Sequence, residues 1–115
     1  MRRLLAALFL TSLALLAQSG HSVTLTWLAP TDVQPASAYN IYRGDGGCTG
    51  TPAYKKINTA PIAALTYVDT VVVAGATYCY VATHTLNGGE SAYSNTAQAI
   101  IPVSAPRSLT ISIGD

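Results

Sequence analysis

Beyond residue 20, apolar and polar residues alternate with a period of two, and no stretch shows the apolar spacing of a helix. The clearest example spans residues 22–27, where Val23, Leu25 and Trp27 alternate with Ser and Thr. Such alternation predicts half-buried strands. The strands are short, and turn signals recur every eight to twelve residues or so, as in a β-sandwich or small barrel. The chain is therefore predicted to be all-β.

The remaining strands follow from the same pattern and from the turn residues between them. Asn87-Gly88-Gly89 is a hairpin signal, and Pro102 ends the last strand, because proline cannot donate to a ladder. A glycine-rich loop covers residues 44–50. Strands are expected at residues 39–43, 54–57, 65–69, 77–83 and 92–101.

Residues 1–19 differ in composition from the rest of the chain. Arg2 and Arg3 precede an apolar run over residues 4–17, and the small residues Ala17 and Ser19 suit cleavage after Ser19. This order predicts a helical secretory signal peptide. The run is shorter than the roughly 20 residues of a membrane span, and an uncleaved anchor is the alternative. We expect a secreted or cell-envelope domain with no stable membrane span after cleavage.

The charge of the exported part argues against nucleic acid as a partner. The full chain has six Lys and Arg residues against five Asp and Glu, and two of the basic residues lie in the signal peptide. The remaining chain has one more acidic than basic residue and no basic patch, which nucleic-acid binding requires.

Cys48 and Cys79 are the only cysteines, and both lie in the exported part. An even number of cysteines in an oxidising compartment favours a disulfide. Zinc is the competing interpretation, but two cysteines without a cluster of histidines do not complete a tetrahedral metal shell. We therefore expect a Cys48–Cys79 disulfide, and no metal or other cofactor.

Four motifs, in order along the chain, resemble a fibronectin type III domain of the bacterial secreted type over residues 22–102. They are Trp27, the segment Tyr39-Asn40-Ile41-Tyr42-Arg43, residues 72–78 with Ala74 in place of the family's proline, and residues 90–95. The resemblance implies an immunoglobulin-like β-sandwich with Trp27, Tyr39, Tyr78 and Tyr80 in its core. Tyr78 would be the tyrosine corner, whose hydroxyl bonds to the preceding turn. The disulfide would cross the outer face of one sheet, because Cys79 alternates away from Tyr78 and Tyr80.

The chain departs from this family at both ends of the domain. The predicted cleavage site nearly abuts the strand at residues 22–27, so the family's first strand has no room. In the tail, residues 103–115, Leu109, Ile111 and Ile113 alternate with Ser and Thr, which predicts an extra strand. It could pair with its own domain's open edge, self-associate with a neighbouring molecule, or begin a further domain of a longer chain.

A catalytic constellation is not expected, because the only histidines are His21 and His84. His84 lies near Glu90 along the predicted hairpin, and the plain interpretation is a solvated loop pair. No nucleophile, base and orienting acid come together in the predicted strands. The domain is therefore predicted not to be an enzyme.

Two further patterns have both a functional and a plain structural interpretation. Arg43-Gly44-Asp45 is the tripeptide of integrin ligands, but here it closes a strand, where Arg and Gly are common. Tyr42, Tyr54 and Tyr93 are expected on the outer face or in loops. Exposed aromatics can stack on sugars or proteins, although scattered surface tyrosines are usual.

The expected function is that of a secreted, non-catalytic module. It would bind an unknown protein or polysaccharide, or act as a spacer. One alternative is a structural subunit that assembles by exchange of its C-terminal strand. The other is an accessory fragment of a larger extracellular polysaccharide-degrading enzyme.

Overall fold

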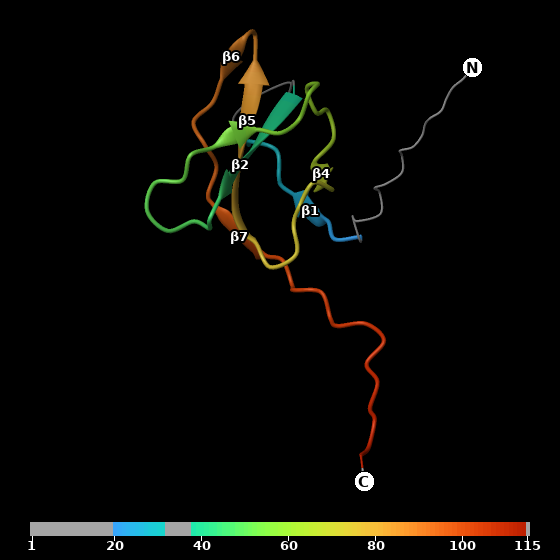
Figure 1. The fold of residues 1–115 in the computed structure, drawn as a ribbon. Helices are drawn as coiled ribbons and strands as arrows, with labels where there is room; N and C mark the ends of the chain where they lie inside the picture. Colours follow the sequence, from blue (N-terminus) through green and yellow to red (C-terminus); the bar gives the residue numbers. More distant parts are fainter. Residues whose placement is uncertain (1–19, 32–37, 115) are drawn as a thin grey trace, which may run out of the picture.

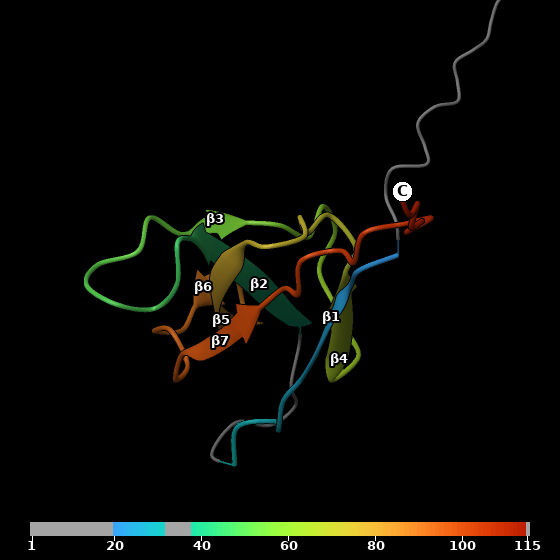
Figure 2. The same cartoon turned by 60° about the horizontal axis from the view of Figure 1, so that its bottom comes forward.

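The computed structural model describes residues 20–31 and 38–114, and they form two β-sheets packed face to face (Figures 1 and 2). The described residues include no helix that could span a membrane. The all-β prediction is confirmed, whereas the predicted signal helix lies outside the described residues. The smaller sheet pairs β1 (Val23–Thr26) with β4 (Thr66–Asp69). The larger sheet contains β2 (Ala38–Asp45), β3 (Lys55–Lys56), β5 (Thr77–Leu86), β6 (Gly89–Glu90) and β7 (Ala97–Ile100).

Strand β5 is the centre of the larger sheet. It pairs with β2 over eight residues, from Ala38 opposite Thr85 to Asp45 opposite Tyr78, and with β6 and β7 on its other edge. A two-residue turn joins β5 to β6, with positive φ at Asn87 and Gly88, as the hairpin signal predicted. Strand β3 pairs with the far edge of β2.

The predicted continuous strand over residues 92–101 is wrong, because the return path is divided into β6 and β7. The Ser91 hydroxyl accepts a hydrogen bond from the backbone N–H of His84, and Ser94 does the same for Ala82, each at 2.9 Å. Serine side chains thus replace part of the backbone ladder, since short hydroxyl side chains compete with regular pairing. This irregular segment brings Tyr93 over the outer face of the sheet.

The core lies between the sheets and is built mostly from alternate residues of β2 and β5. Ile41, Tyr78, Tyr80 and Ile101 are buried there, and the smaller sheet contributes Val23, Leu25 and Tyr67. The Trp27 ring packs on Tyr39 with centroids 5.4 Å apart. The Tyr78 hydroxyl accepts a hydrogen bond from the Val73 N–H at 3.1 Å and so closes the turn before β5. This is the geometry of a tyrosine corner.

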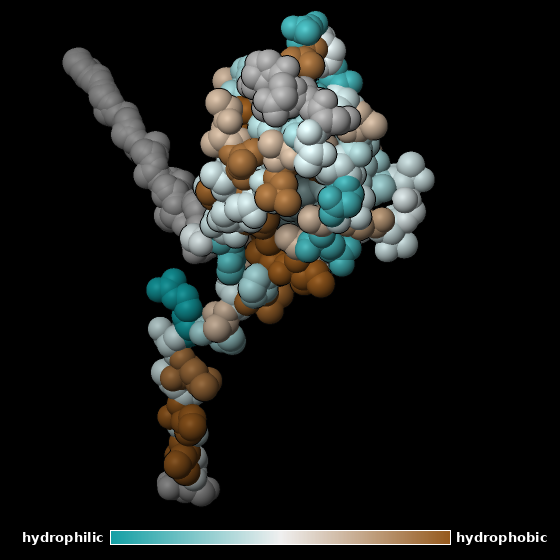
Figure 3. Space-filling view, turned by 180° about the vertical axis from the view of Figure 1, so that it is seen from behind, coloured by the Kyte–Doolittle hydropathy of each residue, from teal (hydrophilic) through white to brown (hydrophobic). Residues whose placement is uncertain are grey.

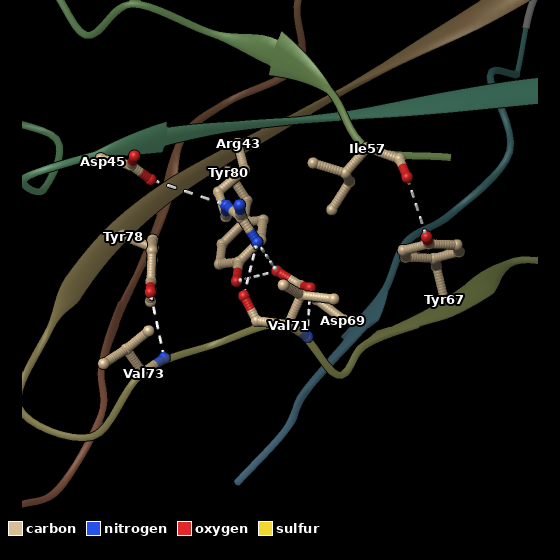
Figure 4. A network of polar contacts seen from close by, with 9 residues as sticks. All are labelled: Arg43, Asp45, Ile57, Tyr67, Asp69, Val71, Val73, Tyr78 and Tyr80. Atoms are coloured by element: carbon tan, nitrogen blue, oxygen red, sulfur yellow. Dashed lines mark hydrogen bonds and ion pairs between the residues drawn. The ribbon is translucent and has the colours of Figure 1, made fainter. Parts of the chain in front are cut away.

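Asp69 of β4 connects the two sheets through a polar network (Figure 4). Its Oδ2 accepts hydrogen bonds from Nη1 of Arg43 on β2 at 2.9 Å and from the hydroxyl of Tyr80 on β5 at 2.7 Å. Its Oδ1 accepts from the Val71 N–H at 3.1 Å. The Arg43 guanidinium also lies 5.0 Å from the centre of the Tyr78 ring. Burial, and then the bond to Asp69, raises the pKa of Tyr80 well above its usual value, so its hydroxyl stays a donor.

The predicted disulfide between Cys48 and Cys79 is confirmed, with Cα atoms 4.8 Å apart. Cys79 lies on the outer face of the sheet but is fully buried, and the Tyr54 hydroxyl is 3.3 Å from its sulfur. Gln98 of β7 accepts a hydrogen bond from the Cys48 N–H at 2.9 Å, which holds the loop to the sheet. Gly47 has φ of +91°, and a Cβ there would lie 3.0 Å from the Gln98 oxygen, so the loop needs glycine at this position.

Among the described residues, 103–114 form no strand, so the extra strand in the tail stays a prediction. Residues 103–114 leave the sandwich in an extended path with no partner strand (Figures 1 and 3). Leu109, Ile111 and Ile113 are each more than 80% exposed. A strand requires a neighbour for its backbone groups, and no other described segment lies alongside the tail to supply one.

We expect Asp69→Asn to lower the free energy of unfolding by about 2–3 kcal/mol, because it leaves the partly buried Arg43 without its counter-charge. Urea unfolding followed by tyrosine fluorescence measures the change. The matched control is Asp45→Asn, whose carboxylate is 81% exposed and 3.6 Å from Arg43. That change should cost less than about 0.5 kcal/mol. Equal effects of the two substitutions would contradict the role given to Asp69.

Replacing both Cys48 and Cys79 by Ala should lower the free energy of unfolding by about 3–4 kcal/mol, because the crosslink spans 31 residues of sequence. The comparison is urea unfolding of the oxidised protein, with Thr49→Ala in the same loop as the control. An unchanged unfolding midpoint in the double variant would show that the loop holds without the bond.

Candidate functional site

Most residues that the sequence singled out lie inside the sandwich and do not form a surface site. Tyr39, Tyr78 and Tyr80 are buried and Trp27 is half-buried. Cys79 is covered by Tyr54. Their contacts hold the fold together, so a functional surface must be sought elsewhere.

Among the residues that the structure describes, His84 and the acidic side chains do not come together as a nucleophile, base and orienting acid. His84 is buried with its ring 5.4 Å from that of Tyr39. Glu90 bonds to side chains of β2 and β5 instead: Asn40, Tyr42 and Thr83. In the part of the chain that the structure describes, no three His, Cys, Asp or Glu side chains could hold a metal ion together.

The Arg43-Gly44-Asp45 tripeptide lies within β2 rather than in a displayed loop. The Arg43 side chain is only 20% exposed, and its Nη1 donates to Asp69 and to the Val71 carbonyl oxygen. Gly44 is buried, and a Cβ there would meet Pro52 at 2.8 Å. The contacts of Arg43 and Gly44 are those of a structural strand end, so this geometry favours the structural interpretation of the tripeptide.

Three tyrosines form one contiguous cluster on the outer face of the larger sheet. The Tyr93 ring lies 5.4 Å from the Tyr42 ring and 5.1 Å from the Tyr54 ring, measured between centroids. Tyr93 is 53% exposed, and Tyr42 and Tyr54 are half-buried. We call Tyr42, Tyr54 and Tyr93 the tyrosine face. The sequence placed each of them outside the core, but only the irregular path between β6 and β7 brings them together.

Glu90 fixes a negative charge beside the tyrosine face. Its Oε2 accepts hydrogen bonds from the hydroxyls of Thr83 and Tyr42 and from Nδ2 of Asn40. These bonds, that of Thr83 foremost, lower the pKa of Glu90. The bond to Glu90 is also the main cause that raises the pKa of Tyr42 to about 12. At neutral pH the site therefore presents a carboxylate with fixed orientation, a neutral phenol and an exposed aromatic ring, groups that can contact a polar ligand.

The chain is similar to part of a bacterial enzyme and to solved structures of bacterial and animal proteins. No family model matches the chain. It is 34% identical over 92 residues to an amylopullulanase of Thermoanaerobacterium saccharolyticum, an alignment that covers 77% of this chain and 7% of that protein. The chain thus spans a small part of that relative's length.

Among solved structures, an Fn3-like protein from Clostridium thermocellum is 34% identical, with a TM-score of 0.58, and the match covers 76% of this chain and 84% of that one. The fourth FNIII domain of a human protein (23% identical, TM-score 0.60, 76% and 72% covered) shares the fold. So does the twitchin kinase region of C. elegans (18% identical, TM-score 0.60, 75% and 15% covered). On this identity and coverage, together with the tyrosine-corner geometry and the sheet order, the chain belongs to the fibronectin type III family.

Proposed function

We propose that the chain is a non-catalytic module that works beside a polysaccharide-degrading enzyme and binds polysaccharide through the tyrosine face. The observation that carries the proposal is the contiguous, partly exposed cluster of Tyr42, Tyr54 and Tyr93 beside the fixed carboxylate of Glu90. The similarity to an amylopullulanase supports α-glucans as the class of polysaccharide.

The chemistry of the site matches that of a sugar chain. The C–H faces of sugar rings pack on aromatic rings, and sugar hydroxyls donate to carboxylates. Tyr93 offers the exposed ring, and Glu90 offers acceptor capacity on the same face. The rings are tilted by 59° and 63° relative to one another, so they suit a curved chain better than a flat crystalline surface.

The disulfide supports a location outside the cytoplasm. Such bonds persist in oxidising compartments and are rare in the reducing cytosol. A secreted or envelope location is where a module of this kind would meet polysaccharide.

The proposal is tested by affinity electrophoresis through gels that contain soluble starch or pullulan, with a gel of a soluble β-glucan for comparison. The α-glucan gels should retard the protein. Tyr93→Ala should weaken binding by roughly fivefold or more, on the order of 1 kcal/mol.

The matched control is Val68→Ala, which removes an exposed apolar side chain from the outer face of the smaller sheet. This variant should be retarded like the original protein, and thermal unfolding checks that both variants are folded. Free migration of the original protein in every gel would overturn glycan binding and favour a spacer.

A further inference from the structure

Strand β1 has one edge without a partner strand. The Trp27 N–H donates to the Leu65 carbonyl at 3.1 Å, and bonded pairs alternate along an antiparallel ladder. Leu25 and Val23 therefore direct their backbone groups toward β4, whereas Thr24 and Thr26 direct theirs to the opposite edge. Across residues 20–31 and 38–114, β1 pairs with β4 alone. The backbone of Thr24 and Thr26 is thus available for a further strand.

An apolar groove follows this free edge, between β1 and the segment that leads into β7. It has a volume of about 100 Å³ and is lined by core residues, among them Leu25, Trp27, Ile41 and Tyr80. A second groove of about 140 Å³ continues past Trp27 toward Leu28 and Ala92. The core therefore reaches the surface where β1 lacks a neighbour.

Trp27 lines both grooves, and its side chain has no hydrogen bond. Its indole Nε1 is buried and has no hydrogen-bond partner. A buried N–H normally finds an acceptor. The carbonyl oxygens of a strand placed along the groove would supply acceptors of this kind.

The tail carries the pattern that such a strand needs. Leu109, Ile111 and Ile113 would line one face of a strand, with Ser108, Thr110 and Ser112 on the other. The three apolar side chains are 82–90% exposed (Figure 3). A strand with one apolar and one polar face fits an edge that has a core on one side and solvent on the other.

We propose that the tail of one copy of this chain adds as an extra strand to the free edge of β1 in a second copy. Leu109, Ile111 and Ile113 would face the groove, and the Ser and Thr residues would face solvent. Each copy has one tail and one free edge, so the contact is head to tail and extends to further copies. The inference is independent of glycan binding, because the tyrosine face lies on the other sheet.

The position of the tail favours a second copy over the chain's own edge. The tail leaves the sandwich at the end where β1 begins (Figures 1 and 2). An antiparallel strand on β1 must enter at the opposite end, near Trp27, and residues 103–108 would have to cross the domain and then reverse. Pro102 and Pro106 favour extended backbone at the residues before them, Ile101 and Ala105. When two copies are stacked end to end, the tail of one copy reaches the Trp27 end of β1 in the other copy without a reversal.

The test measures the mass of the exported protein by sedimentation between about 1 µM and 1 mM, the range expected for one added strand. The average mass should at least double across this range. Ile111→Asp should abolish the increase, because it places a charge in the apolar groove. The matched control is Thr110→Asp, which puts the same charge on the solvent face of the added strand and should leave assembly intact.

A second variant blocks the receiving edge. Thr24→Pro removes an N–H that points away from β4, so it spares the β1–β4 ladder while it prevents addition of a strand. Each variant alone should be monomeric, with a thermal unfolding transition that shows it is folded. A mixture of Ile111→Asp and Thr24→Pro should form a heterodimer and nothing larger, because one intact tail and one intact edge remain. If Thr24→Pro does not fold, Thr26→Pro serves in its place.

Three results would overturn the proposal. The first is a monomer at every concentration, with or without a tail paired to its own domain. The second is assembly that Ile111→Asp and Thr110→Asp affect equally. The third is a mixture of the two blocked variants that stays monomeric.

Discussion

The carboxylate of Asp69 is the polar contact that joins the smaller sheet to both central strands of the larger sheet. Two strands alone are marginal in water, so β1 and β4 need the larger sheet for their stability. Packing of Leu25 and Tyr67 on the core supplies most of the attachment. Asp69 adds a polar attachment with defined geometry, because it accepts hydrogen bonds from Arg43 of β2 and from Tyr80 of β5. The same network engages the Arg43 side chain. This explains why the Arg43-Gly44-Asp45 tripeptide has a structural role in this position.

The sequence was sufficient where one local rule decided the outcome. Period-two alternation located most strands, Asn87 and Gly88 located the hairpin, and the even number of cysteines beyond residue 20 indicated the disulfide. The complete burial of Cys79 was harder to predict from the sequence. Alternation placed it on the outer face, but its burial depends on Tyr54, which arrives from another part of the chain.

The candidate site was not predictable as a unit, because it depends on a departure from regular pairing. The hydroxyls of Ser91 and Ser94 accept hydrogen bonds that backbone carbonyl groups would accept in a regular strand. The resulting backbone path places Tyr93 against Tyr42 and Tyr54. No local sequence pattern indicates that a serine hydroxyl will take the place of a backbone group in the hydrogen bonds between two strands. The strand predicted in the tail stays a prediction for a related reason: alternation shows that residues 109–113 suit a strand, but it does not identify the partner strand.

The free edge of β1 and the unpaired tail are thus two halves of one interaction. The most direct measurement of their pairing is amide hydrogen exchange by NMR at Thr24 and Thr26, whose N–H groups point to the free edge, over a series of protein concentrations. The account predicts that both amides, together with those of the tail around Ile111, become protected as concentration rises, while Val23 and Leu25 are protected throughout. Rapid exchange at Thr24 and Thr26 at every concentration would contradict it.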